Sequence, residues 1–364
     1  MSSSFGQLLK ISIFGESHSF GIGMSIDGLP AGISIDMDQI YKALKNRHIS
    51  DGFSTSRNEE DKVVFISGIF NNATTGAPLA FFIQNKDSRP EDYEKGVIRP
   101  SHADLTNYIK YNGNNDYRGG GFSSGRLTAS LVVLGSICEQ ILGKYNIKIL
   151  THVLNIHGIN DRNIDFSNIE KEAQLLDNPF PVLDAELKEK MIKEIKNAKE
   201  NNDSVGGITE SVIVGLPAGI GEPYFDSLES SISNLLFSIG GIKGVLFGDG
   251  IDFANKFGSE VNDQICINNG DIHYLSNHSG GINGGISNGQ PVSIKCVVKP
   301  VSSIGKTQKS INIETKENID LSIKGRHDPC IVHRVAHVVN AVLYYAILDA
   351  LMVNKGRNIW LKQG

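Results

Sequence analysis

The sequence predicts an α+β fold, a duplicated β-α-β sandwich in which antiparallel sheets lie outside a helical core. The first observation is a repeat. The six-residue segment Gly28–Ile33 recurs letter for letter as Gly215–Ile220, and each copy follows a predicted strand and precedes a predicted helix. The second observation is that each half contains a glycine-rich loop and ends in an apolar segment typical of a buried helix. Chance repetition of one turn is the alternative. We predict one domain over residues 1–364, built of two similar halves at about 1–185 and 186–364.

The first half contains short strands, a capped helix and a buried helix. Runs of apolar and β-branched residues predict the strands, and Asp36 is a good N-cap for the helix that follows it. The segment at 127–142 is hydrophobic on nearly every side, which predicts a buried helix. The predicted strands are at 8–14, 21–26, 62–69 and 78–85, and the predicted helices are at 37–47, 101–111 and 127–142.

The second half continues the alternation of strands and helices, with a charged helix at 185–199. The segment at 208–214 alternates in hydrophobicity, which predicts a half-buried strand. Asp226 is the predicted N-cap of a helix that ends near Gly240 and Gly241. Further strands are predicted at 147–156 and 291–299, and a long apolar helix at 332–353.

Composition restricts the class of protein. The chain has 364 residues, 40% of them hydrophobic, and a net charge of −5, which argues against a general nucleic-acid-binding protein. Its four cysteines are scattered and form no CxxC pair, so we expect reduced thiols and no zinc or other metal site. The N-terminal residues do not resemble a signal peptide, and no stretch holds 18 uncharged apolar residues. We therefore expect a cytoplasmic protein that does not contact a membrane.

The segment Arg118–Arg126 has the composition of an anion-binding loop. Its three consecutive glycines, beginning at Gly119, allow positive φ angles that turn backbone N–H groups inward. Ser123 and Ser124 are good N-caps for the apolar helix that follows, and a helix N-terminus attracts negative charge. A plain glycine turn before a core helix explains the same letters, so this segment alone leaves both interpretations open.

Histidines and arginines in the predicted loops suggest acid–base chemistry on an anionic ligand. His18 follows a strand and His102 precedes a helix; histidine titrates near neutral pH, although a loop histidine is more often structural or exposed. Guanidinium groups at the ends of elements match phosphate and carboxylate groups, with solvated side chains as the alternative. The arginines in such positions are Arg47, Arg57, Arg99, Arg118, Arg126 and Arg326.

Three segments near the C-terminus add to this pattern. Lys299–Ser303 places a cation and two hydroxyl groups at a strand end, which suits a phosphate. The glycine-rich segment at 280–289 has no nucleotide-binding fingerprint, but glycines permit close approach to a flat ring. Asp328 is either a base or the cap of the last helix. The residues alone therefore predict an enzyme with a small polyanionic substrate, and they do not define the reaction.

Six motifs, taken together, resemble chorismate synthase in their order and spacing, and the resemblance extends from about Leu8 to Leu351. It implies a lyase of the shikimate pathway that converts 5-enolpyruvylshikimate 3-phosphate to chorismate and phosphate by a 1,4-anti elimination. It also implies a requirement for reduced FMN, helices between antiparallel sheets, and a homotetramer. The motifs are Gly15-Glu16-Ser17-His18, Arg99-Pro100-Ser101-His102-Ala103-Asp104, Asp116-Tyr117-Arg118-Gly119-Gly120-Gly121, Ser123-Ser124-Gly125-Arg126, Ser276-Asn277-His278-Ser279-Gly280-Gly281 and Gly325-Arg326-His327-Asp328-Pro329-Cys330.

The resemblance implies a role for each matching position. His18 would be the acid toward the leaving phosphate, aided by Ser17, and His102 would hold the protonation state of the flavin. Asp328, with Arg326, would assist loss of the proton from C6. The substrate-binding residues would be Arg47, Arg57, Arg99 and Arg126. The cofactor-binding residues would be Ser123, Ser124, Gly240, Gly241, Gly284, Lys299, Pro300, Val301, Ser302, Ser303 and Arg326.

The chain also departs from the family pattern. Phe122 stands where the family commonly has arginine, Ser19 replaces a glycine, and the arginine loop after Arg47 is shorter. With no added domain visible, these differences predict a monofunctional enzyme that receives reduced FMN from a separate flavin reductase and uses NADPH only indirectly. The rival hypotheses are a flavin oxidoreductase with the same site and a non-catalytic anion- or RNA-binding protein, which the net charge disfavours.

Overall fold

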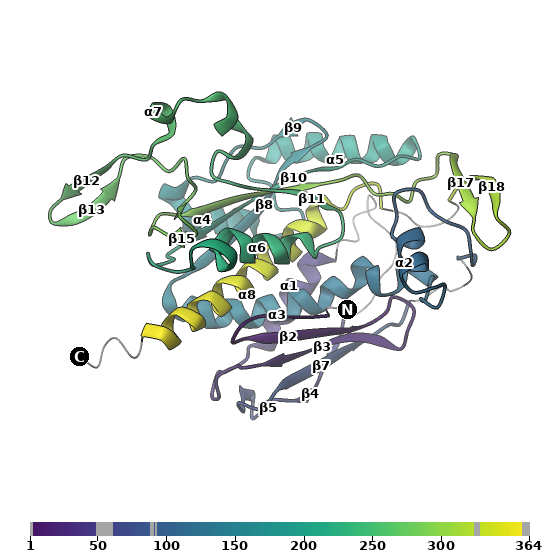
Figure 1. Cartoon of the computed structure of the whole chain (residues 1–364), viewed down its shortest axis with the longest axis horizontal. Coiled ribbons are helices and arrows are strands. Elements are labelled where there is room, and N and C mark those ends of the chain that lie inside the picture. Colours follow the sequence, from purple (N-terminus) through teal and green to yellow (C-terminus); the bar gives the residue numbers. More distant parts are fainter. Residues whose placement is uncertain (1–2, 49–60, 88–90, 92, 324–327, 359–364) are drawn as a thin grey trace.

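Two five-stranded antiparallel sheets lie on either side of a layer of helices (Figure 1). The computed structural model describes residues 3–48, 61–87, 91, 93–323 and 328–358. The first sheet has the strand order β1-β2-β3-β7-β4, and the second has the order β11-β16-β10-β8-β9. The α+β sandwich predicted from the sequence is therefore confirmed.

All strand pairs in the two sheets are antiparallel. The first sheet consists of β1 Ser4–Phe5, β2 Lys10–Gly15, β3 Gly21–Asp27, β4 Val63–Ser67 and β7 Leu79–Gln84. The second consists of β8 Lys148–Ile156, β9 Ile159–Asn160, β10 Gly207–Val214, β11 Ile242–Phe247 and β16 Val292–Val298.

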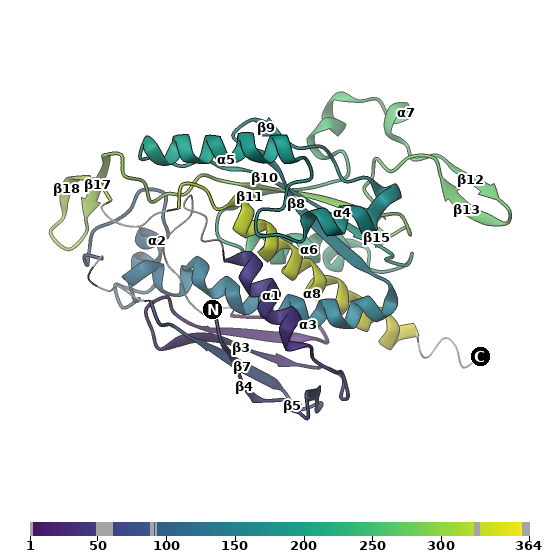
Figure 2. The ribbon, with the colours of Figure 1, turned by 180° about the vertical axis from the view of Figure 1, so that it is seen from behind.

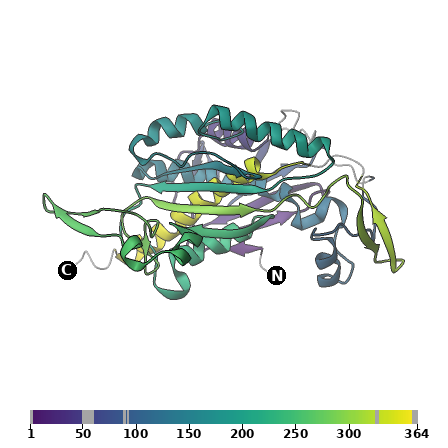
Figure 3. The same cartoon turned by 90° about the horizontal axis from the view of Figure 1, so that it is seen from above.

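Within the part of the chain that the structure describes, four small hairpins are separate from the sheets. Two of them, β12–β13 and β17–β18, project at opposite ends of the molecule (Figure 3). The hairpins are β5 Ile69–Phe70 with β6 Ala73–Thr74, β12 Ile265–Asn268 with β13 Asp271–Tyr274, β14 Ile282–Asn283 with β15 Ile286–Ser287, and β17 Gln308–Asn312 with β18 Glu317–Leu321.

Four helices occupy the space between the sheets (Figures 1 and 2). They are α1 Met37–Arg47, α3 Thr128–Leu142, α6 Leu228–Phe237 and α8 Val332–Asn358. Their buried side chains join those of both sheets in one hydrophobic core. By length and composition two stretches of the described residues could each cross a membrane, Arg118–Tyr145, which contains α3, and Val332–Gly356 in α8, but most of each stretch is buried inside the protein.

The remaining helices lie outside this layer. α2 Asp104–Lys110 lies at the end of the sandwich where α3 and α8 both begin (Figure 1). α4 Ile169–Leu176 and α5 Ala185–Glu200 lie on the side of the second sheet away from α3, and α7 Gly258–Val261 belongs to the connection between β11 and β12.

The order of elements occurs twice along the chain. The series β2, β3, α1, β4, β7 and α3 corresponds to the series β8, β10, α6, β11, β16 and α8. Matching strands occupy matching positions in the two sheets. The fold is therefore duplicated as predicted, although the division near residue 185 stays a prediction, since the repeated order starts at β2 and at β8.

A hydroxyl side chain binds each copy of the six-residue repeat through the same pair of hydrogen bonds. In the first copy, Thr74 Oγ1 donates to Pro30 O (2.6 Å) and accepts from the N–H three residues after that proline (2.9 Å). In the second, Ser287 Oγ donates to Pro217 O (2.7 Å) and accepts from the N–H three residues later (2.9 Å). Because one hydroxyl group holds each turn in the same way, the repeat reflects a repeated structure and not a chance match of letters.

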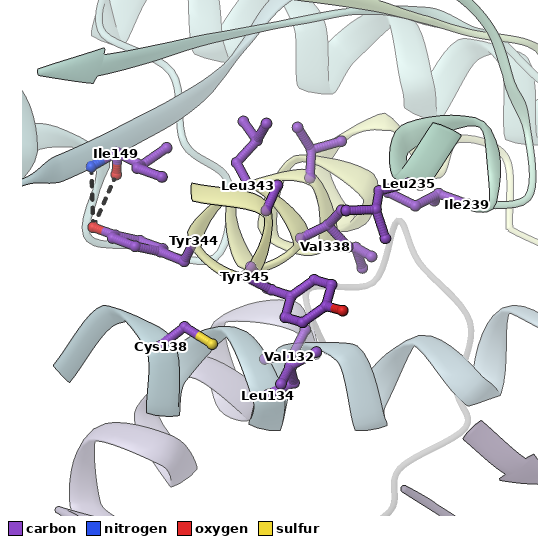
Figure 4. Packing of buried hydrophobic residues seen from close by; sticks show 14 of the residues in the cluster. Val132, Leu134, Cys138, Ile149, Leu235, Ile239, Val338, Leu343, Tyr344 and Tyr345 are labelled. Atoms are coloured by element: carbon purple, nitrogen blue, oxygen red, sulfur yellow. Dashed lines mark hydrogen bonds between the residues drawn. The ribbon is translucent and has the colours of Figure 1, made fainter. Parts of the chain in front are cut away.

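Helices α3 and α8 pack closely because Gly135 faces α8. A Cβ at Gly135 would lie 2.3 Å from Ala341 Cα and 2.6 Å from its carbonyl oxygen. Two consecutive tyrosines then attach α8 to both sheets. Figure 4 shows both rings and the hydrogen bonds that join Tyr344 to Ile149. Tyr344 Oη accepts a hydrogen bond from Ile149 N in β8 (3.1 Å), and Tyr345 Oη donates to the carbonyl oxygen just before β2 (2.8 Å).

Two local predictions are wrong. β10 is buried on both faces and not half-buried, because α4 and the segment before it cover the outer side of the second sheet, where Val212 packs near Leu150. The N-cap of α6 is Ser227, whose hydroxyl accepts a backbone N–H of that helix (3.0 Å). Asp226 instead ends a short 3-10 turn that precedes the cap.

Gly135→Ala is expected to lower the free energy of unfolding by roughly 1–3 kcal/mol, because the added methyl group meets backbone atoms of α8. Gly143→Ala is the matched control: Gly143 has helical angles and no atom within 4 Å of the added Cβ. There the same exchange is expected to be neutral or to stabilise by about 0.5–1 kcal/mol. Urea unfolding measures both variants, and equal midpoints would contradict the close packing of the two helices.

Candidate active site

Most of the predicted site residues in the described part of the chain gather at the end of the molecule where α3 and α8 begin. The segment before α3 consists of the glycine turn Arg118–Ser123, which has non-helical backbone angles at its three glycines, and a 3-10 turn at Gly125–Leu127, and Ser124 Oγ accepts the N–H of Arg126 (3.3 Å). The two helices run away from this end roughly side by side (Figure 1). Both therefore direct the positive ends of their dipoles toward the same region.

The glycine loop holds both candidate histidines. Gly119, Gly120 and Gly121 have φ angles of 58°, 84° and 54°, which side chains rarely adopt. A Cβ at Gly119 would lie 2.4 Å from His18 Cε1, and a Cβ at Gly120 would lie 3.1 Å from His102 Cε1. The absent side chains therefore let two imidazole rings contact adjacent residues of one loop.

Ser17 and His18 lie in the turn between β2 and β3. Ser17 is only 1% exposed, and its backbone N–H donates to Gly121 O (3.2 Å). The ring of His18 meets the ring of Tyr93 edge-on, with 5.1 Å between the centroids. Arg99 Cζ lies 5.6 Å from the centroid of the same tyrosine. Tyr93 thus connects the two parts of the site that carry His18 and His102.

His102 is held by a carboxylate and a guanidinium group. His102 Nδ1 lies 2.7 Å from Asp104 Oδ1, and Arg99 donates to both carboxylate oxygens of Asp104, from Nε (2.7 Å) and from a terminal nitrogen (2.8 Å). Burial alone would raise the pKa of Asp104, but the hydrogen bonds from Arg99 and His102 hold that pKa well below its ordinary value. Asp104 is therefore an ionised acceptor at neutral pH.

The segment 299–303 approaches the same loop from the second half of the chain. Lys299 Nζ donates to Ser101 O (2.7 Å), Ser302 Oγ donates to the same oxygen (2.9 Å), and Arg99 donates to Ser303 Oγ (3.4 Å). Burial, together with the charge of Lys243, lowers the pKa of Lys299. The cation and hydroxyl groups that the sequence suggested for a phosphate thus lie beside His102.

Four more of the predicted cofactor positions, Gly240, Gly241, Pro300 and Val301, lie in or beside the 299–303 segment. Gly241 O accepts the N–H of Lys299 (2.9 Å), so Gly241 and its neighbour Gly240 lie beside the 299–303 segment. Val301 O accepts a hydrogen bond from Ser204 Oγ (2.7 Å), which ties its backbone to the segment that leads into β10. Pro300 packs where a Cβ at Gly206 would reach it.

Arginines and aspartates surround the start of α3. Arg126 is only 8% exposed, and it donates to Asp61 Oδ1 (2.5 Å) and to Asn85 Oδ1 (3.0 Å). Arg47 donates to Gly125 O and to Thr128 Oγ1 (both 2.8 Å), so it holds the first turn of the helix. The guanidinium groups are in place, but in the protein without ligand they are already engaged by the chain itself.

The start of α8 adds a third arginine to this group. Arg334 lies 3.2 Å from Asp328 Oδ2. Burial and then the charge of Arg334, followed by the charges of Arg47 and Arg126, lower the pKa of His48. These charges act on one imidazole, so the three arginines belong to one region of positive potential.

Some predicted residues are not brought to this region. Gly284 lies in the β14–β15 turn, next to the N-terminal end of α6, where Gly285 O accepts the N–H of Leu228 (2.9 Å). Gly240 and Gly241 follow the C-terminal end of that ten-residue helix, about 15 Å away. Within one chain, Gly284 is therefore separated from the other cofactor positions. Arg57 and Arg326 lie outside the described residues.

Ser123 and Phe122, which follow the three glycines, contact neither candidate histidine in any described hydrogen bond or ring contact. Ser123 Oγ exchanges hydrogen bonds with the side chain of Asn107 in α2 (2.9 and 3.2 Å). Phe122 is 41% exposed, so its ring is not part of the core.

Two cavities lined by described residues lie near the predicted site residues. A cavity of about 270 Å³ lies beside the glycine loop and is lined by Tyr93, Arg99 and Asp104, among others. A cavity of about 630 Å³ lies farther along α3 and includes neither candidate histidine.

Three residues of the site were not predicted as functional. Asp104 stands two residues after His102, and a carboxylate this close to a histidine in the sequence indicates a hydrogen-bonding partner for its ring. Arg334 is a charged residue in the first turn of an apolar helix, a position that usually requires a partner. Tyr93 carried no signal in the sequence, because its contacts are to residues of other elements.

Comparisons with known proteins agree on one family. The family model described as Chorismate synthase matches residues 9–352. The chain is 41% identical over 352 residues to a chorismate synthase of Dehalococcoides mccartyi, covering 96% of each chain. It is 42% identical over 354 residues to that of Lachnoclostridium phytofermentans, covering 96% of this chain and 95% of the relative. A solved structure titled "Crystal Structure of Chorismate Synthase" superposes with a TM-score of 0.74 at 27% identity, covering 96% of this chain and 93% of the other.

Gly119→Ala is expected to displace His18, because the added methyl group would lie 2.4 Å from its ring. A left-handed φ also costs a residue other than glycine roughly 1–2 kcal/mol. Gly125→Ala is the control in the same loop, since nothing lies within 4 Å of its added Cβ. Diethyl pyrocarbonate should modify His18 severalfold faster in the first variant, measured by mass spectrometry. Equal rates in the two variants would show that the loop does not hold this ring.

Proposed function

Because this chain belongs to the chorismate synthase family, we propose that it converts 5-enolpyruvylshikimate 3-phosphate to chorismate and phosphate by a 1,4-anti elimination. The family serves the shikimate pathway of aromatic amino-acid biosynthesis. The observation that carries the proposal is the contact of His18 and His102 with adjacent glycines of one loop. That loop lies among arginines, at the end where two buried helices begin. An acid–base pair beside a basic region suits the removal of a phosphate and a proton from a polyanion.

The arginines are the proposed binding groups for the phosphate and the two carboxylates of the substrate. Arg47, Arg99 and Arg126 would bind them, and Arg334 is added to this set on the evidence of its position; Arg57 stays a prediction. The aspartates that now contact these arginines orient the guanidinium groups. A planar guanidinium with a fixed orientation recognises an anion at low entropic cost.

The donors around Lys299 support reduced FMN as the cofactor. A flavin mononucleotide presents a phosphate together with carbonyl and N–H groups, and these require a cation and hydroxyl donors. Lys299, Ser302 and Ser303 would supply such donors, with Ser123 and Gly241 nearby. When bound, reduced FMN would supply an electron-rich ring that stabilises an electron-poor transition state without net oxidation. Ser124, Gly240, Pro300, Val301, Gly284 and Arg326 stay predictions as cofactor contacts.

The residues of this chain would then move or hold the protons. His18 would donate a proton to the leaving phosphate, with Ser17 as a second donor. His102 would lie at the edge of the cofactor and hold the protonation state of the flavin. Asp328 would assist removal of the proton from C6, and its contact with Arg334 supports that assignment by orienting the carboxylate. The shorter arginine loop after Arg47 and Phe122 at a position where the family commonly has arginine support a monofunctional enzyme, supplied with reduced FMN by a separate reductase. The family resemblance is the basis for the proposed cytoplasmic homotetramer.

An anaerobic assay with 5-enolpyruvylshikimate 3-phosphate and chemically reduced FMN tests the proposal. Phosphate and chorismate should appear in equal amounts, with the flavin spectrum unchanged over many turnovers. His18→Ala and His102→Ala should each lower turnover at least about tenfold, since loss of a general acid or base typically costs about 10²–10⁴-fold. His273→Ala, on the exposed β12–β13 hairpin, is the control.

Near-normal turnover in both histidine variants would remove the acid–base assignment. Net oxidation of the substrate would favour a flavin oxidoreductase. Turnover with only NADPH and oxidised FMN, without an added reductase, would contradict the monofunctional assignment.

A further inference from the structure

We propose that Asp104 is a positioning residue: it fixes the proton of His102 on Nδ1, so that Nε2 is the nitrogen available to the ligand. This inference rests on the proposed function for its catalytic consequence, because it concerns how His102 is presented to the cofactor and substrate. Its structural part concerns only His102 and its neighbours, and it can be measured in the protein alone.

The distance and the chemistry of the acceptor define which nitrogen donates. Asp104 Oδ1 lies 2.7 Å from His102 Nδ1, which is a short charge-assisted hydrogen bond. A terminal nitrogen of Arg99 also lies 3.1 Å from Nδ1, and it can donate there only when Nδ1 carries no proton. An unprotonated Nδ1 would turn its lone pair toward the ionised Asp104 oxygen at the shorter distance of 2.7 Å, and an ionised carboxylate has no proton to donate, so the hydrogen of the shorter bond is assigned to Nδ1. A neutral imidazole carries one N–H, and Nε2 is then left with its lone pair.

Arg99 prevents the carboxylate from turning or taking up a proton. Arg99 donates to Asp104 through three N–H groups: Nε (2.7 Å) and the backbone N (3.1 Å) to Oδ2, and a terminal nitrogen (2.8 Å) to Oδ1. The side chains of Arg99 and Asp104 are only 15% and 11% exposed. A rotation of the carboxylate would break several of these bonds at once, so the arginine holds the acceptor that holds the histidine.

The glycine loop defines what the other edge of the ring faces. A Cβ at Gly120 would lie 3.1 Å from His102 Cε1 and 3.6 Å from Nε2. The Nε2 edge therefore faces the side of the loop that carries no side chain, while Nδ1 faces Asp104. Lys299 and Ser302 both donate to Ser101 O, immediately before His102, so the proposed cofactor donors lie on the same segment.

Replacement by the isosteric amide reverses the tautomer. In Asp104→Asn, the amide oxygen is expected to stay at the Oδ2 position, where Nε and N of Arg99 both donate. The NH₂ group then faces His102 Nδ1, which can accept only without its proton, and the proton moves to Nε2. In this orientation NH₂ meets one donor of Arg99, the terminal nitrogen at the Oδ1 position, whereas the opposite orientation would place NH₂ against two donors, Nε and the backbone N. The same kind of reversal in a Ser-His-Asp triad lowers kcat about 10⁴-fold.

The measurement is the ¹⁵N NMR spectrum of the His102 imidazole in the ligand-free protein, at a pH where the ring is neutral. The native protein should show the proton on Nδ1, and Asp104→Asn should show it on Nε2. Asp116→Asn is the matched control, because Asp116 is also paired with an arginine, Arg118 (2.8 Å), and its side chain is also 11% exposed. It should leave the His102 signals unchanged. Arg99→Gln, which keeps the carboxylate, should keep the Nδ1 proton.

Activity completes the test in the anaerobic assay. Asp104→Asn should lower kcat at least about 100-fold, within the range for loss of a correctly protonated acid or base. Asp104→Glu, which restores a carboxylate, should recover part of the rate and the native tautomer. The proposal is overturned if native His102 carries its proton on Nε2, a result that needs no variant. It is also overturned if the tautomer reverses while kcat stays within threefold. Absence of turnover in the native protein would refute the proposed function and leave the tautomer result standing.

Discussion

The close packing of α3 against α8 is the contact on which the rest of the structure depends. Gly135 lets the backbones meet, and Tyr344 and Tyr345 attach α8 to both sheets. Because the two helices begin at the same end, their N-termini combine with nearby arginines into one region that attracts anions. A shift of either helix would separate Arg126 and Arg47 at the start of α3 from Arg334 at the start of α8. The core contact thus also determines the geometry of the site.

Duplication explains where the site lies. In each half, a long connection leads from the last strand of the main sheet, β7 or β16, to the helix α3 or α8. These connections, at about 85–127 and 299–331, carry most of the site residues. They meet directly: Ile98 N donates to Ile311 O (3.2 Å), and Ile313 N donates to Gly96 O (2.9 Å). The repeated parts of the halves build the framework and also supply Ser17, His18 and Arg47, while the two unequal connections provide most of the other site residues.

Aspartates pair with four arginines of the site in the protein without ligand: Arg99 with Asp104, Arg118 with Asp116, Arg126 with Asp61, and Arg334 with Asp328. Taking an unpaired guanidinium out of water would be costly, and each carboxylate offsets that cost while it fixes the orientation of the group. An anionic ligand therefore meets donors that are already ordered. Asp104 also forms a hydrogen bond with the ring of His102, so its pairing with Arg99 fixes the position of that ring as well.

Local pattern determined much of this protein. The buried helices, the cap at Asp36 and the repeat of Gly28–Ile33 were predictable because they depend on residues close in the sequence, and the ordered motifs identified the family. The tertiary structure alone decided which groups meet across the chain: Arg126 with Asp61, Arg99 with Ser303, and Thr74 and Ser287 with the two repeats. It also decided that β10 is covered on both faces and that Gly284 lies apart from the other glycines. Such contacts join residues tens to hundreds of positions apart, and the packing of whole helices and sheets sets them, so no periodicity or short motif could reveal them.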